Sequence, residues 1–313
     1  MRSPLLDLPG AVPADGPDAD VAAHYGDLFA EQRALAKGEA VVDRSNREVV
    51  RVSGVDRLKW LNDLTSQKLD TLAPGQWAQT LVLDLQGHVE HHLTLVDDGE
   101  AVLAHVEPGA SASLIDYLDR MRFMLRVEVT DMSGELAVLS TSDEDVLVPR
   151  AELSDHLGKP LAGLWAYEAL RIERHRPRLG FDTDHKTIPH EVGWIGAAVH
   201  LSKGCYRGQE TVARVHNLGH PPRRLVFLHL DGSVDTLPVH GAPVIFESQE
   251  VGTVGSAARH HELGPIALAV IKRTVPVDAP LLAGGVAASQ EVIVPPDAGR
   301  NVSIDPSLRR RIR

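Results

Sequence analysis

The chain has 313 residues and a formal net charge of −11, with 43% hydrophobic and only 4% aromatic residues. This length predicts two domains or three small ones, with a sizeable core built mainly from aliphatic side chains. The acidic balance argues against general nucleic-acid binding through a basic surface. No run approaches the ~18 apolar residues that a membrane-spanning helix needs. A single cysteine, Cys205, excludes an internal disulfide, and with no visible secretory signal it predicts a cytoplasmic location.

The first half of the chain alternates irregularly between helical and strand patterns. Residues 1–20 are rich in Pro, Gly and Asp, which predicts a flexible tail. Apolar spacing of three to four residues indicates helices, and alternating or continuous apolar runs between turn residues indicate strands. The predicted helices are 21–40, a segment from Gly54 to Leu64, and 111–122; the predicted strands are 40–42, 49–52, 80–85, 88–96, 101–106 and 125–130.

The second half begins with a predicted helix over 161–173, which Pro177 ends. Residues 175–200 have little periodicity and predict a long connection that helps to form a site. A short helix follows over 208–219, and Pro221 and Pro222 then mark a boundary. Beyond them only strands are predicted, which indicates a small separate β-barrel; these strands are 225–230, 243–246, 251–257, 266–271 and 292–294. Hairpins and irregular alternation favour an α+β fold with antiparallel sheets over a doubly wound parallel sheet.

The most distinctive stretch is residues 203–210, with the sequence KGCYRGQE. Cys205 lies just before the predicted helix, and Lys203 and Arg207 flank it. A helix N-terminus and nearby cations both favour thiolate over thiol, so we expect a reactive cysteine. The alternative is a small buried core cysteine.

This stretch resembles the signature of the YgfZ-like proteins, which are folate-binding relatives of the glycine-cleavage T-protein, the GcvT aminomethyltransferases. The resemblance spans roughly residues 24–293. It is also carried by Leu170-Arg171-Ile172-Glu173, Pro177-Arg178-Leu179-Gly180, residues 188–194 (IPHEVGW) and residues 212–217 (VARVHN).

The resemblance implies a cloverleaf of antiparallel-sheet subdomains with helices, followed by a small C-terminal β-barrel. We therefore expect a folate-binding unit over 21–222, made of two interleaved subdomains, 21–52 with 131–222, and 53–130. The barrel is expected over 223–296 and a C-terminal tail over 297–313. The arginine-rich end, Leu308 to Arg313, is predicted to be solvated, although a contact with RNA or a membrane is an alternative.

The resemblance also implies tetrahydrofolate as the cofactor and assigns roles to individual residues. Glu173 and Glu191 are expected to hold the pterin, because a carboxylate accepts two hydrogen bonds at once. Arg214 is expected to meet the anionic glutamate tail or to pair with a neighbouring carboxylate. Cys205 is the candidate catalytic residue. The remaining residues of its motif support it; they are Lys203, Gly204, Tyr206, Gly208, Gln209 and Glu210.

The sequence departs from the T-protein pattern in the run from Gly87 to Leu93. T-proteins carry two aspartates here, and His91 and His92 stand in their places. This change argues against aminomethyltransferase activity, whereas a folate pocket can persist without it. A metal site of His88, Glu90 and His92 is an alternative, but alternate residues on a flat strand spread over ~13 Å, so no metal site is expected.

Two functions follow from the resemblance. The first is a tetrahydrofolate-binding accessory protein that supports assembly, repair or maintenance of iron–sulfur proteins, some of which modify tRNA; its partners are reduced folate and iron–sulfur client or assembly proteins. The second is a folate-dependent one-carbon transferase acting on a small amine. The chain has no phosphate-binding loop, Cys-x-x-Cys pair or nucleophile elbow, so nucleotide cofactors, clusters bound within the chain and serine-hydrolase chemistry are not expected.

Overall fold

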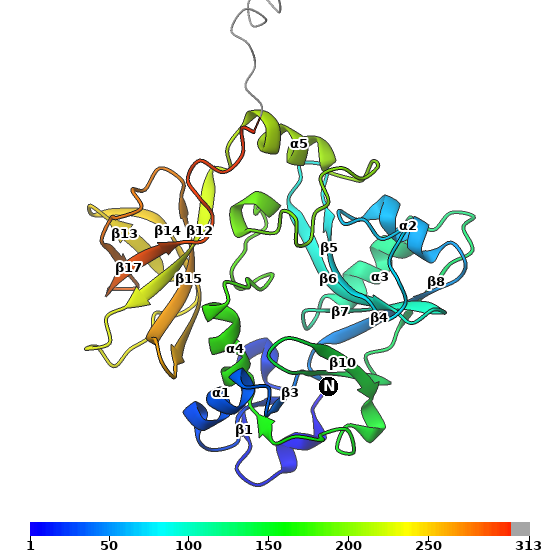
Figure 1. Ribbon diagram of the computed structural model, residues 1–313, viewed down its shortest axis with the longest axis horizontal. Coiled ribbons are helices and arrows are strands. Elements are labelled where there is room, and N and C mark those ends of the chain that lie inside the picture. Colours follow the sequence, from blue (N-terminus) through cyan, green and yellow to red (C-terminus); the bar gives the residue numbers. More distant parts are fainter. Residues whose placement is uncertain (302–313) are drawn as a thin grey trace, which may run out of the picture.

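The structure is a computed structural model that describes residues 1–301. Three groups of elements surround a common centre (Figure 1). They are a five-stranded sheet with two helices, a four-stranded sheet with two helices, and a closed six-stranded barrel. This arrangement confirms the predicted α+β fold of sheets and helices followed by a small barrel. The basic C-terminal end, predicted to be solvated, lies outside the described residues.

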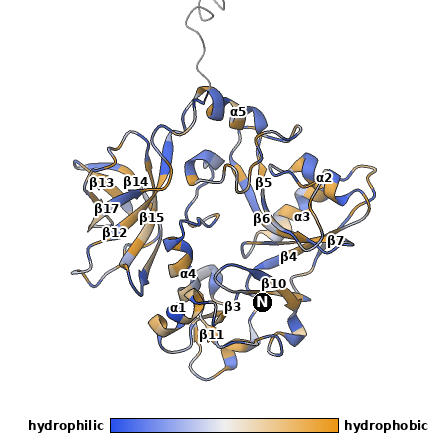
Figure 2. Cartoon of the chain, viewed as in Figure 1, coloured by the Kyte–Doolittle hydropathy of each residue, from blue (hydrophilic) through white to orange (hydrophobic). Residues whose placement is uncertain are grey.

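The five-stranded sheet has the order β5-β6-β7-β4-β8, and its paired strands are antiparallel. Helices α2 (Arg57–Leu64) and α3 (Ser111–Arg120) share its hydrophobic core, in which Trp60 and Leu114 are buried. The strands are β4 (Glu48–Ser53), β5 (Trp77–Leu83), β6 (Val89–Asp97), β7 (Ala101–Val106) and β8 (Glu128–Asp131). Along β6, buried residues alternate with more exposed ones, and Figure 2 shows the same mixture of hydropathies along the strands.

The four-stranded sheet has the order β10-β9-β3-β11 and contains one parallel pair, β11 with β3. Its helices are α1 (Leu28–Ala36), capped by Asp27, and α4 (Leu164–Glu173). Its strands are β3 (Val41–Asp43), β9 (Leu136–Ser140), β10 (Asp145–Pro149) and β11 (Leu161–Ala162). A two-stranded sheet, β1 (Val12–Pro13) with β2 (Ala22–His24), packs beside it, and single 3-10 turns lie at Pro4–Asp7, Gly16–Asp18 and Arg150–Glu152.

The barrel closes in the order β12-β15-β14-β13-β16-β17, so it leaves no open sheet edge. Aliphatic side chains such as Val226, Leu228 and Ile271 fill its interior. The strands are β12 (Arg223–Leu230), β13 (Pro243–Phe246), β14 (Gln249–His260), β15 (Gly264–Lys272), β16 (Leu281–Ala283) and β17 (Val286–Val292). A further core joins the barrel to β5, to η4 (Pro189–Val192) and to α5 (Gln209–Leu218).

Several expectations need correction. Residues 1–20 are not a free tail, because Leu5 is 1% exposed and Asp18 is buried in an ion pair with Arg178. The helix expected over 21–40 divides into β2 and the shorter α1, and the helix expected from residue 161 starts at Leu164, after β11. The strand expected over 125–130 begins only at Glu128.

Two further observations concern the predicted boundaries. The predicted subdomain limits assign most of β4 to the subdomain 21–52 with 131–222 and most of β8 to the subdomain 53–130. In the structure these two strands pair with each other in one sheet. Within residues 1–301, no helix is long and apolar enough to cross a membrane.

Candidate functional site

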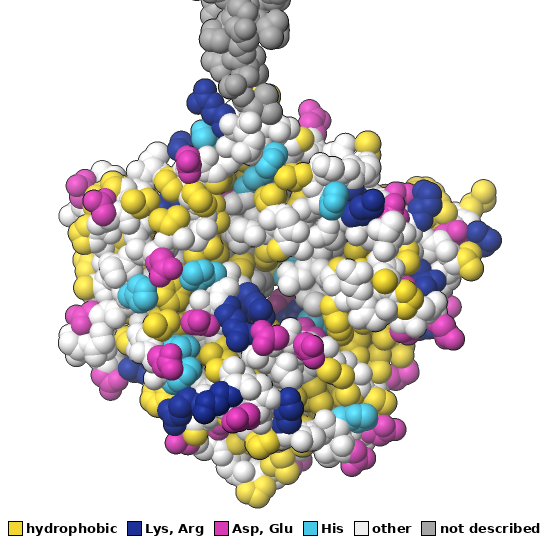
Figure 3. Space-filling model, in the orientation of Figure 1, with side chains coloured by type: hydrophobic (Ala, Val, Ile, Leu, Met, Phe, Trp, Pro, Cys, Tyr) yellow, Lys and Arg dark blue, Asp and Glu magenta, His cyan; other side chains and the backbone are white. Residues whose placement is uncertain are grey.

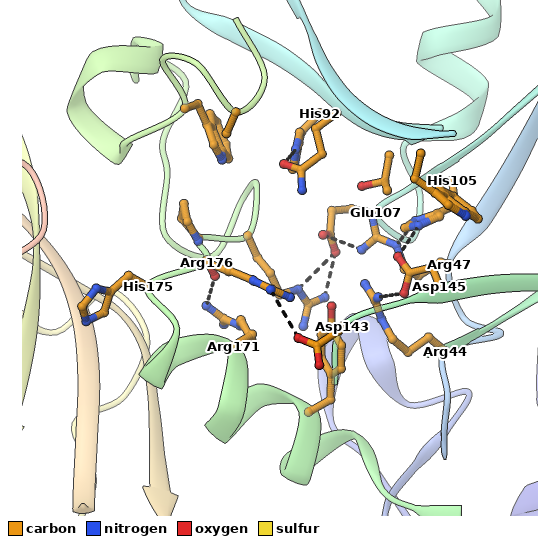
Figure 4. Close-up of a pocket in the computed structure, with 18 of the residues that line it drawn as sticks. Arg44, Arg47, His92, His105, Glu107, Asp143, Asp145, Arg171, His175 and Arg176 are labelled. Atoms are coloured by element: carbon orange, nitrogen blue, oxygen red, sulfur yellow. Dashed lines mark hydrogen bonds and ion pairs between the residues drawn. The ribbon is translucent and has the colours of Figure 1, made fainter. Parts of the chain in front are cut away.

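A cavity of about 640 Å³ lies at the junction of the two sheets and the segments that lead to the barrel; we call it the central pocket. Its walls come from the β3–β4 turn, from β5, β6 and β7, from the β9–β10 turn, from α4 and its following segment, and from the residues after η4. Figure 4 shows many of its side chains directed toward one another. The site is therefore assembled from segments that are far apart in the sequence.

Arginine–carboxylate pairs form the buried floor of the central pocket. Arg178 donates to Asp18 at 3.0 Å, Glu107 at 2.8 Å and Glu168 at 3.0 Å, and Arg47 donates to the other oxygen of Glu107 at 2.6 Å. Burial alone raises the pKa of Glu107, but the two arginines outweigh it and hold that pKa well below its usual range. Glu107 is therefore charged, and each of the three carboxylates is paired with Arg178.

His105 extends this network toward the four-stranded sheet. The Nε–H of Arg47 donates to His105 Nδ1 at 2.8 Å, so Nε2 carries the proton and donates to Asp145 Oδ2 at 2.9 Å. Burial and the neighbouring Arg47 lower the pKa of His105 to about 4, which keeps the ring neutral at physiological pH. Arg44 donates to Asp145 at 3.2 Å and lies over the ring of Tyr167 at 4.2 Å.

His92 stands in the pocket wall opposite this floor (Figure 4). Its Nε2 hydrogen-bonds Gln79 Oε1 at 3.1 Å, and its ring lies 4.8 Å from that of Trp194. Burial lowers the pKa of His92 to about 4, with a smaller contribution from Arg47, so the ring is neutral at pH 7. His92 and Trp194 therefore give this side of the pocket two neighbouring uncharged rings.

His91 does not share the pocket with His92, because successive strand residues point to opposite faces of the sheet. It lines a separate surface groove together with Asp84, His88 and Arg207. Of the two histidines that the resemblance places at aspartate positions, only His92 lines the central pocket. The described part of the chain contains no group of three or more His, Cys, Asp or Glu side chains that could hold a metal ion.

Glu191 is buried, but it does not line the central pocket. Its two oxygens accept hydrogen bonds from Arg223 of β12, both at 2.8 Å, and one also accepts from the N–H of Ile188 at 3.2 Å. Glu191 therefore ties the η4 segment to the barrel. Neither carboxylate oxygen of Glu191 faces the central pocket.

Glu173 and Arg214 also lie outside the pocket lining. Glu173 ends α4 with a side chain that is 39% exposed, and Arg174 Nε is 3.8 Å away. Arg214 is exposed on α5. Their contacts with folate therefore stay a prediction.

Cys205 is exposed in the loop before α5, which contradicts the alternative of a buried core cysteine. The short helix predicted after it is confirmed by α5. The two flanking cations have other partners. Lys203 Nζ binds the carbonyls of Asn62, Thr65 and Gln67 at the C-terminal end of α2, and Arg207 donates to Glu90 at 3.0 Å. Burial lowers the pKa of Lys203 to about 8. Lys203 therefore anchors the loop to α2.

The remaining motif residues fix the start of α5. Gly208 has φ +81° and lies against the β5–β6 turn, where an added Cβ would be 3.1 Å from Gly87 Cα. Gln209 Oε1 accepts the N–H of Tyr206 at 3.1 Å, and the Tyr206 ring packs against the core that joins α5 to the barrel. No atom lies within 4 Å of a Cβ placed on Gly204. Glu210 is exposed in the first turn of the helix.

Comparison with known proteins identifies relatives across most of the chain. Residues 223–308 match the family described as the glycine cleavage T-protein C-terminal barrel domain. The aminomethyltransferase of Synechococcus sp. (strain WH7803) is 25% identical, and the match covers 82% of this chain and 86% of that protein. The aminomethyltransferase of Bacillus subtilis (strain 168) is 24% identical, covering 86% and 90%. The chain is therefore similar to aminomethyltransferases over most of its length.

A chloroplast protein of Arabidopsis thaliana, assigned provisionally as a transferase, is 24% identical over 71% of this chain, and the match spans 62% of its own length. The crystal structure of the glycine cleavage system aminomethyltransferase T from Bartonella henselae aligns with a TM-score of 0.77 and 16% identity, covering 96% of this chain and 98% of that one. This alignment shows that the two proteins share a fold. It also agrees with the closed barrel found at the C-terminal end.

Sequence reasoning missed most of the residues that line the central pocket. Arg178 was part of a segment that carries the family resemblance, but no role was predicted for it. No role was predicted for Arg44, Arg47, His105 or Glu107 either. A signal was present, because several of these charged residues stand within or beside predicted apolar strands, where an unpaired charge is costly. Such a residue needs a buried partner, but the sequence does not say which one.

Proposed function

We propose that this chain binds tetrahydrofolate in the central pocket and acts as an accessory protein in the assembly, repair or maintenance of iron–sulfur proteins. The observation that carries the first part is the pocket itself, with a volume of about 640 Å³ and the neighbouring rings of His92 and Trp194 in its wall. Pockets of this size hold ligands of about the size of folate. The relation to aminomethyltransferases supports the same choice.

The arrangement of charges favours binding over one-carbon chemistry. The carboxylates in the pocket floor, Glu107 and Asp145, are committed to arginines and to His105, so neither is available as a base. The pKa of His92, about 4, is also far below the value near 7 that suits a general base at neutral pH. Neither these two carboxylates nor His92 is therefore well placed to transfer protons.

The accessory role adds Cys205, which the YgfZ-like resemblance places at the centre of function. Its loop is exposed and is anchored through Lys203 to α2, so a partner protein can reach the sulfur while folate occupies the pocket. Ligand and cysteine then act from different surfaces of one molecule. Activity of iron–sulfur enzymes in cells that lack this protein tests the idea. Wild type should restore that activity and Cys205→Ser should not; equal restoration by both contradicts the role of the thiol.

Folate binding is tested by anaerobic calorimetry with tetrahydrofolate. His92→Ala removes a ring contact and a hydrogen bond, and should weaken binding by about 1–2 kcal/mol. His91→Ala is the matched control, because that neighbour faces the separate groove and should leave affinity unchanged. Absence of heat with wild type at high folate concentration contradicts the proposal. Equal loss in the two variants places the ligand elsewhere.

A second function is one-carbon transfer between folate and a small amine, and the similarity to aminomethyltransferases over 82% of this chain favours it. Anaerobic turnover with methylene-tetrahydrofolate and ammonia or a small amine distinguishes it from the accessory role. Turnover that His92→Ala abolishes supports a transferase. Folate binding without turnover supports the accessory protein.

A further inference from the structure

The mouth of the central pocket is crossed by a charged bridge between the β9–β10 turn and the segment that follows α4. Asp143 Oδ1 lies 2.8 Å from Arg174 and 4.0 Å from Arg176. The carbonyl of Ser142 accepts from both arginines, at 3.4 Å in the case of Arg176. Figure 4 shows the guanidinium of Arg176 extended toward Asp143, and Figure 3 shows charged side chains beside a hollow near the centre of this face.

This bridge differs in kind from the ion pairs of the floor. The side chains of Asp143 and Arg176 are 65% and 50% exposed, whereas those of Arg171 and Arg178 are 3% and 9% exposed. Exposed pairs are weak because water and salt screen them, but a buried arginine cannot leave its carboxylates without a large penalty. The bridge at the mouth can therefore open, and the floor is fixed.

Among the arginines that line the pocket, Arg176 has the loosest contacts. Arg44, Arg47, Arg171 and Arg178 are each bound closely to one or more carboxylates. Arg176 has only the 4.0 Å contact with Asp143 and the 3.4 Å contact with a carbonyl. A planar guanidinium with such weak contacts is well suited to bind a carboxylate through two parallel hydrogen bonds.

We propose that Arg176 and Arg174 form a subsite for the carboxylates of the folate glutamyl tail, and that Asp143 occupies this subsite until the ligand displaces it. The inference rests on the proposed function, since it takes the ligand of the central pocket to be a folate. The ring system then lies beside His92 and Trp194, and the anionic end lies at the solvent-exposed mouth. Additional glutamates extend the negative charge toward these two cations.

The same geometry gives the β9–β10 turn a part in selecting the ligand. Asp143 competes with the tail for the same cations, and the exposed Glu144 beside it adds negative charge at the pocket edge. A ligand without a tail leaves the bridge closed and gains nothing from it. A ligand with several carboxylates gains the most, because it replaces one acidic side chain with a more highly charged group.

The experiment measures dissociation constants of the full chain for three probes: 6-methyltetrahydropterin, tetrahydrofolate with one glutamate, and tetrahydrofolate with three glutamates. Asp143→Asn should tighten binding of both tail-bearing probes about threefold to tenfold, and Arg176→Gln should weaken it by a similar factor. Neither variant should change the affinity for the tail-less pterin. Asp278→Asn, an exposed site in the barrel, controls for the change in net charge.

The outcomes separate this inference from the proposed function. If the pterin binds but tail length and both mouth variants have no effect, or affect all probes equally, the subsite is wrong and folate binding stands. If wild type binds none of the three probes, the proposed function fails and the subsite falls with it. Higher affinity for the longer tail that disappears in Arg176→Gln, or in raised salt, supports the subsite.

Discussion

Gly208→Ala tests how the motif around Cys205 is held in place. Gly208 has φ +81°, a left-handed conformation that costs a residue with a Cβ about 1–2 kcal/mol. The added Cβ would also lie 2.6 Å from the carbonyl oxygen of Asp84 and 3.1 Å from the Cα of Gly87. Both are backbone atoms, so a side-chain rotation cannot relieve the contact.

Overpacking of this kind adds about 1–3 kcal/mol, so the total loss is expected to be about 2–5 kcal/mol. That is a large share of the 5–15 kcal/mol by which a typical protein is stable, and the loss should appear as a lower urea midpoint. The start of α5 should also move away from the β5–β6 turn, because that is where the new atom collides.

Gly204→Ala is the matched control within the same motif. Its backbone is not left-handed and no atom lies within 4 Å of the added Cβ, so the change should stay within about 0.5 kcal/mol. Urea unfolding followed by circular dichroism measures both variants at one pH. Equal losses in the two variants would refute this account of the motif.

Three further substitutions test two contacts and one buried histidine. Lys203→Met should lower the free energy of unfolding, measured with urea, by about 1–3 kcal/mol, because three carbonyls at the end of α2 lose their hydrogen-bond donor. Glu191→Gln should lower the free energy of unfolding by a similar amount, because it weakens the ion pair with Arg223. A fall in folate affinity in the same variant would support the folate contact predicted from the sequence. Burial lowers the pKa of His190 from 6.5 to about 4 in the folded protein. As the pH falls from 6.5 toward 4, the histidine is protonated in the unfolded chain but not in the folded one, so the free energy of unfolding falls with pH. Between pH 7 and pH 5 His190→Gln should therefore lose about 2 kcal/mol less stability than wild type, and an unchanged loss would show that His190 does not titrate in this way.

The parts of the fold that the sequence predicted best depend on short-range patterns. Alternation along β6, three-residue spacing in α2 and the strands separated by glycine-rich turns after Pro222 are all visible within about ten residues. The helix after Cys205 was found for the same reason. Its predicted limits, 208–219, differ from those of α5 by one residue at each end.

The central pocket could not be predicted in this way because its contacts are long-range. Arg178 and Asp18 are 160 positions apart, and Arg44 and Asp145 are 101 apart. The polar composition of residues 1–20 is typical of disorder, yet Asp18 is fixed by Arg178, which only the folded chain brings near. The ion pair of Glu191 could not be predicted for a related reason, since its partner Arg223 belongs to the barrel.

The exposure of Cys205 leads to a final prediction about its reactivity. Native protein should be alkylated completely by iodoacetamide without denaturant, because the residue is exposed and the Tyr206 ring packs into the neighbouring core instead of covering it. Arg207 is held by Glu90, so its charge is largely balanced, and Arg207→Gln should change the alkylation rate by less than about twofold. Labelling only after denaturation would show that the thiol is shielded. A tenfold fall in Arg207→Gln would show that this arginine acts on the sulfur after all, as the sequence alone suggested.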